Sequence, residues 1–458
     1  MGRNHRPERI HLLSRAVFST QYITEYKRNL KIAWPVMLGQ VGHMITQLAD
    51  TAMVGKYLGE TPLAAVSLAS SVFVLYLVLI IGLATGITTR VGNYHGEKNN
   101  EGIARATASG LITMIICVAP LAIFAWATNG VLAHLDWPPE VVEIAIPYYK
   151  VLCWSMLPLG VFMAFKHFID GLEITIPAMV VSIVSNLVNV ALNYALIEGN
   201  WGFDAYGLLG AGYATFIARV VMVVLIVAVI LYNKTFRSHC HYILKLGWFP
   251  KQIKEIIKLG FPIGLQYLME GGAFVIGAIM VGWLGKTNAS AHHIALQVSA
   301  FTFMFASGLG SAATIRVSNL LGAKKHNQLG VAIKSLYFMI IMLQLLFAIS
   351  IYTFNKQLPE LFINETEVLQ IAAVLLLFAA LFQVMDGIQL LAAGILRGAS
   401  DVKIPTLIAG ISYWVLAIPI GYLLQQHTNL GPSGVWVGFT VGLSFAAVFL
   451  SFRVRKVL

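Results

Sequence analysis

The sequence predicts an all-α polytopic membrane protein with twelve transmembrane helices in two pseudo-symmetric six-helix lobes. Three observations indicate this fold. The 458 residues are 58 % hydrophobic and only 11 % charged, with a mean hydropathy of +0.77. Apolar runs of about twenty residues, long enough to cross a ~30 Å hydrocarbon core, recur along the whole chain. The two halves of the chain also resemble each other in one register, whereas a soluble protein of this length would carry a far more charged surface.

The predicted spans occupy about half of the chain, and the segments between them are short. This leaves no room for a soluble catalytic domain, so we expect no enzymatic activity. The spans are 33–55, 63–85, 107–128, 146–165, 178–197, 208–232, 259–283, 291–313, 332–353, 370–393, 405–424 and 433–452.

An internal repeat relates the two halves. "WPVMLGQ…TAMVGKYLG" resembles "FPIGLQY…AIMVGWLG", and "TTRVGNYHGEKN" resembles "TIRVSNLLGAKK". The shift is 227 residues between Pro35 and Pro262, and 226 between Arg90 and Arg316. One register therefore persists across most of each half, which chance similarity of apolar sequence does not explain.

Six spans in each half mean that both halves begin on the same side of the membrane, as parallel repeats do. Two such lobes are typical of an alternating-access transporter, although a duplicated channel would show the same signature. The predicted divisions are a cytoplasmic tail (1–28), an N-lobe (29–232), a basic cytoplasmic linker (233–256) and a C-lobe (257–458).

The placement of lysine and arginine predicts the orientation. Loops and tails on one side hold 26 of them, those on the other side hold four, and Arg219 falls inside a span. By the positive-inside rule both termini are cytoplasmic, which suits a multi-pass protein of a plasma membrane, here a bacterial inner membrane. No cleavable signal peptide is expected, because no uninterrupted apolar core precedes Lys31. The net charge of +11 thus reflects orientation, and we expect no nucleic-acid partner.

Four ionisable residues lie well inside predicted spans: Asp50, Arg219, Glu270 and Asp386. A charge at mid-membrane costs about 2.5–3.5 kcal/mol on insertion scales, and such residues commonly mark an ion or substrate path. The alternative is a structural hydrogen bond between helices. For the acids the sequence favours the functional interpretation.

Helical spacing places polar side chains beside these acids. Gln266 precedes Glu270 by four residues, and Gln383 and Gln389 flank Asp386 by three on either side, which puts them on one helix face. In the fifth span, four polar residues fall within ~60° of one another; they are Ser182, Asn186, Asn189 and Asn193. An amide stripe can bind helices together, or it can cradle a cation beside a carboxylate.

A carboxylate in a low-dielectric setting can hold a proton and release it when it is solvated or when a cation arrives. An antiporter needs this chemistry: one site, two competing occupants, and a conformational equilibrium that responds to which of them is bound. The intramembrane acids therefore indicate ion coupling.

The sequence resembles the multidrug and toxic compound extrusion (MATE) transporters, and their NorM-like branch most closely, from about Asn29 to the end. The stretches that carry the resemblance are "AWPVMLGQVGHMITQLADTAMVG", "LGFPIGLQYLMEGGAF", "SAATIRVSNLLGAKK" and "LFAALFQVMDGIQLLAAGILRG". The resemblance implies export of bulky, often cationic or amphipathic compounds by alternating access, in exchange for Na⁺ or H⁺. It implies no cofactor and no metal beyond the coupling ion at Glu270 and Asp386.

The resemblance also implies roles for individual residues. Glu270 and Asp386 match the C-lobe cation-site carboxylates, and Asp50 matches the N-lobe acid of the proton, cation or substrate site. Pro35 matches a first-helix proline linked to bending in some members. The polar neighbours of Asp50 in the family match Asn189, Asn193 and Thr215.

Two positions depart from the family pattern. Phe382 stands where NorM-like proteins often have a tyrosine near the cation site, which removes an oxygen that could bind Na⁺. Arg219 stands one turn after Thr215, where an uncharged residue is expected. It could form an internal ion pair, with Asp50 for example, or place a charge in the N-lobe cavity and alter substrate choice. We treat Phe382, Arg219, Gln266 and Gln383 as accessory candidates.

The rival function within transport is a lipid-linked saccharide flippase of a related superfamily. A flippase would need a strongly cationic cavity for pyrophosphate, and one arginine against three acids argues against it. The expected partners are small-molecule drugs or toxic organic compounds and the lipid bilayer, and the protein is expected to be a monomer.

Overall fold

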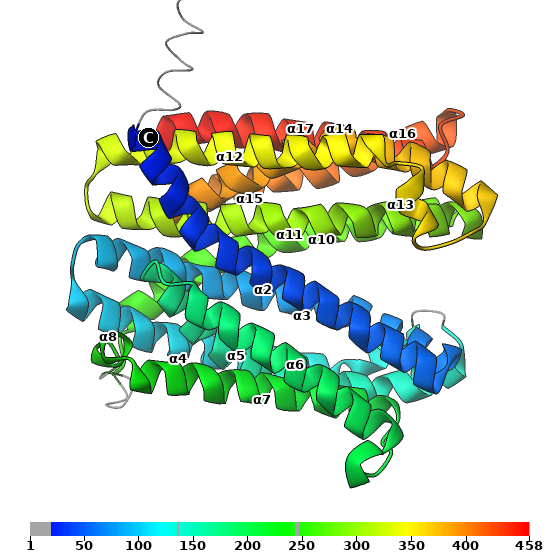
Figure 1. Cartoon of the computed structure of the whole chain (residues 1–458), viewed down its shortest axis with the longest axis horizontal. Coiled ribbons are helices and arrows are strands. Elements are labelled where there is room, and N and C mark those ends of the chain that lie inside the picture. Colours follow the sequence, from blue (N-terminus) through cyan, green and yellow to red (C-terminus); the bar gives the residue numbers. More distant parts are fainter. Residues whose placement is uncertain (1–19, 135–136, 241, 243–246, 458) are drawn as a thin grey trace, which may run out of the picture. The chain divides into compact units, whose positions relative to one another are not determined.

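The computed structural model describes residues 20–134, 137–240, 242 and 247–457. Within these ranges the regular secondary structure is helical throughout, without a strand. Figure 1 shows long helices joined by short connections. The prediction of an all-α fold is confirmed.

The first half contains six long helices, with short helical turns in its connections. The long helices are α2 (Thr20–Leu58), α3 (Glu60–Gly96), α4 (Asn100–Ala127), α5 (Pro139–Gly171), α6 (Ile176–Glu198) and α7 (Leu208–Tyr232). The short elements are η1 (Asn129–His134), η2 (Asn200–Gly202) and α8 (Lys234–Ser238).

The second half repeats this plan with one irregular span. Its elements are α10 (Pro250–Gly282), α11 (Lys286–Gly322), α12 (His326–Thr353), α13 (Gln357–Glu360), α14 (Thr366–Gly398), α15 (Lys403–Gly410), η3 (Ile411–Ala417), α16 (Ile418–His427) and α17 (Pro432–Val457). The segments α15, η3 and α16 follow one another without a break, and η3 is a π-helical stretch inside that span. Such stretches carry wider turns and occur often at functional sites.

Each predicted span lies within a helix, to within one residue at the ends. Eleven helical segments of the described chain are long and apolar enough to cross a membrane. The remaining predicted span, 33–55, is the first along the chain. It lies in the 39-residue helix α2, whose polar side chains lower its hydropathy. The helices also extend past the apolar runs: α2 begins inside the predicted tail, and α10 begins inside the predicted linker. Apolar runs mark only the part of a helix that lies in hydrocarbon. A prediction from such runs therefore makes both helices too short.

The described residues form two compact units. Unit 1 contains the residues up to Met37 and those from Met269 onward, and unit 2 contains Leu38–Leu268. The helices α2 and α10 are therefore each divided: the first part of α2 belongs to unit 1, and the first part of α10 belongs to unit 2. The lobe limits predicted from sequence, 29–232 and 257–458, describe the duplicated halves and stay a prediction. The compact units have different limits, which fall inside these two helices.

Unit 2 is centred on α5, which packs against α3, α4 and α7. The first part of α10 lies directly on α3, because both helices present glycine at the contact. A Cβ atom added to Gly82 would lie 2.2 Å from the Cα atom of Gly264. Small residues at such contacts let helix backbones approach closely, and this packing is one of the forces that hold helices together in a membrane.

In unit 1, α14 packs against α11, α12 and α17. Its contact with α11 is again made by glycine: a Cβ atom on Gly394 would lie 2.3 Å from the carbonyl oxygen of Gly310. The hydroxyl of Thr314 donates a hydrogen bond to the carbonyl of Gly394 at 2.9 Å. The two units thus rely on the same packing device at different helix pairs.

Candidate functional site in the membrane helices

Two carboxylates come together in unit 1. Glu270 on α10 and Asp386 on α14 are 7 % and 6 % exposed, and they lie within electrostatic range of each other. The Nε2 group of Gln389 donates a hydrogen bond to Oε1 of Glu270 at 3.0 Å. Because Gln389 lies three residues after Asp386, one face of α14 supplies both a like charge and a hydrogen-bond donor to Glu270.

Two further residues border this pair. Arg397, in the last turn of α14, and Tyr413, in the π-helical η3, lie within electrostatic range of Glu270. Both are buried, at 4 % and 1 % exposure. Neither residue was predicted as part of the site. Arg397 lies near the end of a span, where a charge is expected at the membrane interface, and nothing in the sequence marks the π-helical turn that carries Tyr413.

Gln383 serves a different contact. Its Nε2 group donates to Oγ1 of Thr302 at 2.6 Å and to Oε1 of Gln344 at 3.1 Å. These bonds join α14 to α11 and α12, so the amide of Gln383 connects helices rather than holding a carboxylate. Gln266 is buried on the part of α10 that belongs to unit 2. Helical spacing put both amides beside Asp386, whereas Gln389 donates to Glu270 and Gln383 to Thr302 and Gln344.

Phe382 is part of an aromatic cluster. Its ring stacks on Trp436 with centroids 5.6 Å apart and ring planes inclined by 20°. Trp436 is fully buried on α17, and its indole nitrogen donates to Nδ1 of His292 at 3.0 Å. A phenylalanine here provides stacking area without a hydroxyl, and the phenol beside Glu270 comes instead from Tyr413.

The oxygens of this cluster could hold a monovalent cation. Hard cations are bound by carboxylate, carbonyl and hydroxyl oxygens. Besides the two carboxylates, Oε1 of Gln389 is buried without a hydrogen-bond partner among the described residues, so it is an acceptor left over by the protein itself. No group of three or more histidine, cysteine or acidic side chains suited to a bound metal occurs in the described ranges.

Asp50, the intramembrane acid of unit 2, accepts hydrogen bonds from two amides. Nδ2 of Asn193 donates to Oδ1 of Asp50 at 2.5 Å. The Asn189 amide, oriented so that both of its ends are satisfied, donates to the same oxygen at 2.8 Å and accepts from the backbone nitrogen of Thr215 at 3.3 Å. The four residues that the family resemblance implied for this site therefore meet, from α2, α6 and α7.

Arg219 does not pair directly with Asp50. Its guanidinium donates to Oγ of Ser155 at 2.5 Å and lies over the ring of Phe73, 5.2 Å from the centroid. Asp50 and Tyr148 lie within its electrostatic range, without direct contact. The direct ion pair considered from sequence is therefore replaced by a hydroxyl and a ring face. Ser155 gave no signal in the sequence, since one serine in an apolar span is unremarkable.

Pro35 is buried in α2, two residues before the unit limit at Met37. Its counterpart Pro262 lies in α10, six residues before the limit at Leu268. Proline removes one backbone hydrogen bond and weakens a helix locally. Both divided helices thus carry a turn weakened by proline close to the division.

A family model described as MatE matches residues 35–195 and 262–423. The two matches begin 227 residues apart, the shift of the internal repeat. A probable multidrug resistance protein NorM of Pasteurella multocida is 31 % identical over 444 residues, covering 95 % of each chain. A probable multidrug resistance protein NorM of Mannheimia succiniciproducens is 30 % identical over 450 residues, with the same coverage.

Solved structures share the fold. The eukaryotic MATE transporter AtDTX14 aligns with a TM-score of 0.86 and 21 % identity, over 95 % of this chain and 99 % of that one. An outward-facing MATE family transporter of the MOP superfamily aligns with a TM-score of 0.87 and 20 % identity, over 94 % and 96 %. Since the family model matches more than half of the residues and the relatives align over nearly the full length, the chain belongs to the MatE family.

Proposed function

We propose that this protein is a cation-coupled multidrug efflux antiporter, which exports bulky, often cationic or amphipathic compounds in exchange for Na⁺ or H⁺. The observation that carries the proposal is the buried pair Glu270 and Asp386, with Gln389 bound to the former. The names of the NorM relatives support the substrate class.

The pair suits a site with exchangeable occupants. Two carboxylates within electrostatic range resist being ionised together, so a proton or a cation between them stabilises the site. The buried Oε1 of Gln389 offers a further oxygen to a cation. A drug that favours the conformation with an empty site, and an ion that favours the filled one, compete through the conformational equilibrium.

For a neutral substrate exchanged 1:1, the membrane potential contributes directly to the driving force. One monovalent cation that moves down 100 mV supplies about 2.3 kcal/mol before any concentration gradient is added. For a monovalent cationic drug, 1:1 exchange is electroneutral, and only the concentration gradient of the coupling ion contributes.

We assign a different role to Asp50. Two amides donate to its Oδ1, and the nearby charge in its electrostatic range is the cationic Arg219. Amide donors stabilise an ionised carboxylate, so this site suits recognition of a cationic substrate or a proton step distinct from that at Glu270. Arg219 would then limit how much positive charge a substrate can carry there.

The direct test is efflux of a fluorescent cationic dye from proteoliposomes under an imposed Na⁺ gradient and, separately, an imposed pH gradient. Glu270→Gln and Asp386→Asn should each abolish gradient-driven efflux. Asp170→Asn is the matched control, because Asp170 is also a buried carboxylate on a membrane helix but pairs with Lys166 at 2.7 Å. Movement of dye under neither gradient, or site variants equal to wild type, would contradict the proposal and favour the flippase function.

Efflux by the variant Phe382→Tyr distinguishes Na⁺ from H⁺ as the coupling ion. If Na⁺ is the coupling ion, an added hydroxyl near the site should lower the Na⁺ concentration needed for half-maximal efflux, by a fewfold. If H⁺ is the coupling ion, the substitution should leave the response to a pH gradient close to that of wild type.

We also propose that the protein lies in a plasma membrane with both termini in the cytoplasm, from the lysine and arginine distribution. The ends of α3, α11 and α14 and the start of α10 then face the cytoplasm. Labelling of an introduced cysteine at Lys325 by a membrane-impermeant reagent should require inside-out vesicles, whereas one at Lys286 should react in right-side-out vesicles.

A further inference from the structure

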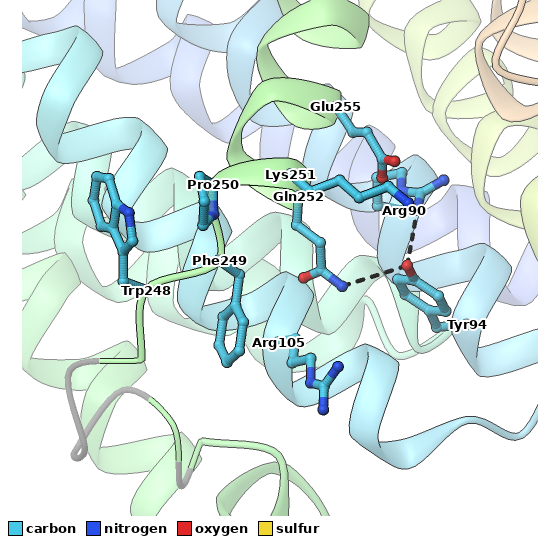
Figure 2. Close-up of a pocket in the computed structure, with 9 residues that line it drawn as sticks. All are labelled: Arg90, Tyr94, Arg105, Trp248, Phe249, Pro250, Lys251, Gln252 and Glu255. Atoms are coloured by element: carbon cyan, nitrogen blue, oxygen red, sulfur yellow. Dashed lines mark hydrogen bonds and ion pairs between the residues drawn. The ribbon is translucent and has the colours of Figure 1, made fainter.

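A cavity of about 430 Å³ lies in unit 2, apart from the intramembrane acids. It is formed where α3 ends, α4 begins and α10 begins, so it lies at one membrane face. Figure 2 shows its lining, which combines cations with aromatic rings. The principal side chains are Arg90, Tyr94, Arg105, Trp248, Phe249 and Lys251.

The two arginines of the cavity are fixed by neighbours. Arg90 pairs with Glu255 at 2.6 Å and donates to the hydroxyl of Tyr94 at 2.9 Å. Arg105 pairs with Glu101 at 2.9 Å and lies over the ring of Phe249, 5.4 Å from the centroid. Glu101 accepts hydrogen bonds from Nε and Nη2 of Arg105. The Nη1 group of Arg105 remains as a donor of the kind that recognises a phosphate.

Lys251 adds a charge that is not neutralised. It is exposed at the start of α10 and forms no ion pair among the described residues. Lys254 and Lys258 follow at spacings of three and four residues and are also exposed, so the three ammonium groups share one helix face. The cavity lining has three cations, of which Arg90 and Arg105 are paired with Glu255 and Glu101, so Lys251 carries the excess positive charge.

Trp248 gives the cavity an apolar wall. Its side chain is 60 % exposed although it is large and aromatic, and it immediately precedes Phe249 and the first turn of α10. Tryptophan at a helix end is typical of the membrane–water interface, where the ring meets the headgroup region. A soluble anion makes no use of such a surface, whereas a lipid does.

We propose that this cavity binds the phosphate headgroup of an anionic phospholipid, with Arg105 and Lys251 contacting the phosphate and Trp248 contacting the glycerol and upper acyl region. Basic pockets and juxtamembrane lysine clusters at the cytoplasmic face bind such headgroups. The binding site goes beyond the proposed antiport and does not depend on it. It gives a binding function to Arg105 and Lys251, which the positive-inside rule explains only as orientation signals.

The test measures lipid binding to the purified full-length protein by native mass spectrometry, with phosphatidylglycerol titrated against phosphatidylcholine. The double variant Arg105→Gln, Lys251→Gln should bind phosphatidylglycerol about thirtyfold more weakly, since each of the two basic residues near an anionic surface contributes about 1 kcal/mol. The control is Lys324→Gln, Lys325→Gln, which removes the same charge from two exposed lysines after α11 in unit 1. This control should match wild type.

A second measurement does not depend on removing charge. Phosphatidylglycerol brominated near the glycerol should quench part of the tryptophan fluorescence of wild type, and this part should be missing in Trp248→Phe. Equal weakening in both double variants, or quenching unchanged in Trp248→Phe, would overturn the proposal. A third outcome would also overturn it: inorganic phosphate binds, the double variant of the cavity weakens this binding equally, and phosphatidylglycerol is not preferred. The ligand would then be a soluble phosphate.

Discussion

Arg90 in unit 2 and Arg316 in unit 1 occupy equivalent positions in the internal repeat, and each pairs with a glutamate at 2.6 Å. In both units the glutamate comes from the early part of a divided helix: Glu255 from α10 and Glu25 from α2. The surroundings differ. The side chains of the unit 2 pair are 24 % and 33 % exposed, whereas those of the unit 1 pair are 4 % and 6 % exposed.

The difference shows that duplication preserved the contact and not its details. A shift of 227 residues relates Glu255 to Arg28 and Glu25 to Gln252, so the two glutamates are one helical turn apart in the repeat. The two arginines are equivalent in the repeat, whereas the two acids lie three residues apart on their partner helices. The function common to both pairs is to fix the first part of a divided helix to its unit, and burial then sets how strongly each does so.

The largest expected effect is in unit 1. Arg316→Met should destabilise the protein by about 3 kcal/mol or more, because it leaves the buried Glu25 carboxylate with only the more distant Arg28, at 3.6 Å. The measurement is thermal unfolding of the detergent-purified protein, followed by tryptophan fluorescence. The matched control is Arg90→Met, and equal losses of stability in the two variants would contradict the comparison.

Glycine contacts should give intermediate and similar effects in the two units. Gly82→Ala and Gly394→Ala each place a methyl group within 2.3 Å of a facing backbone atom, so the helices must separate. The expected cost is about 1–3 kcal/mol for each, as for other overpacked cores. Gly39→Ala is the control, since nothing lies within 4 Å of the added methyl group. A stability loss in only one unit would show that the packing is less alike than the geometry indicates.

The smallest expected effect is that of the unit 2 ion pair. Arg90→Met should cost about 1 kcal/mol or less, because the pair is partly solvated and its charges are screened. Raising the salt concentration should weaken wild type by a similar amount and leave Arg90→Met almost unchanged. A large loss of stability in this variant at any salt concentration would mean that Arg90 also holds the cavity at the start of α10 together.

The membrane fold could be predicted from sequence because hydrocarbon imposes a length on apolar runs. All twelve predicted spans lie in helices, including 33–55, which hydropathy alone barely marks. The division of α2 and α10 between units could not be predicted. It depends on which helices, distant in sequence, each part of α2 and α10 contacts. The sequence does not show whether two glycines such as Gly82 and Gly264 are in contact.

The candidate site was predicted in part for a similar reason. A carboxylate in a span is conspicuous because it is costly, so Asp50, Glu270 and Asp386 stand out. The neutral partners do not: Ser155, which accepts from Arg219, and Trp436, which stacks on Phe382, are ordinary residues of apolar spans. Helical spacing identifies neighbours on one helix, such as Gln389, and it is silent about contacts between helices.

The division of α2 and α10 has a consequence for how the chain is assembled. A protein cut within the linker after α8 would yield two fragments, and neither would contain a whole unit: the fragment with unit 2 would lack the first part of α10, and the fragment with unit 1 would lack the first part of α2. This is the relation found in domain swapping, where two copies exchange an identical element. The two halves should therefore be obligate partners that complement each other when they are co-expressed, and neither should accumulate alone.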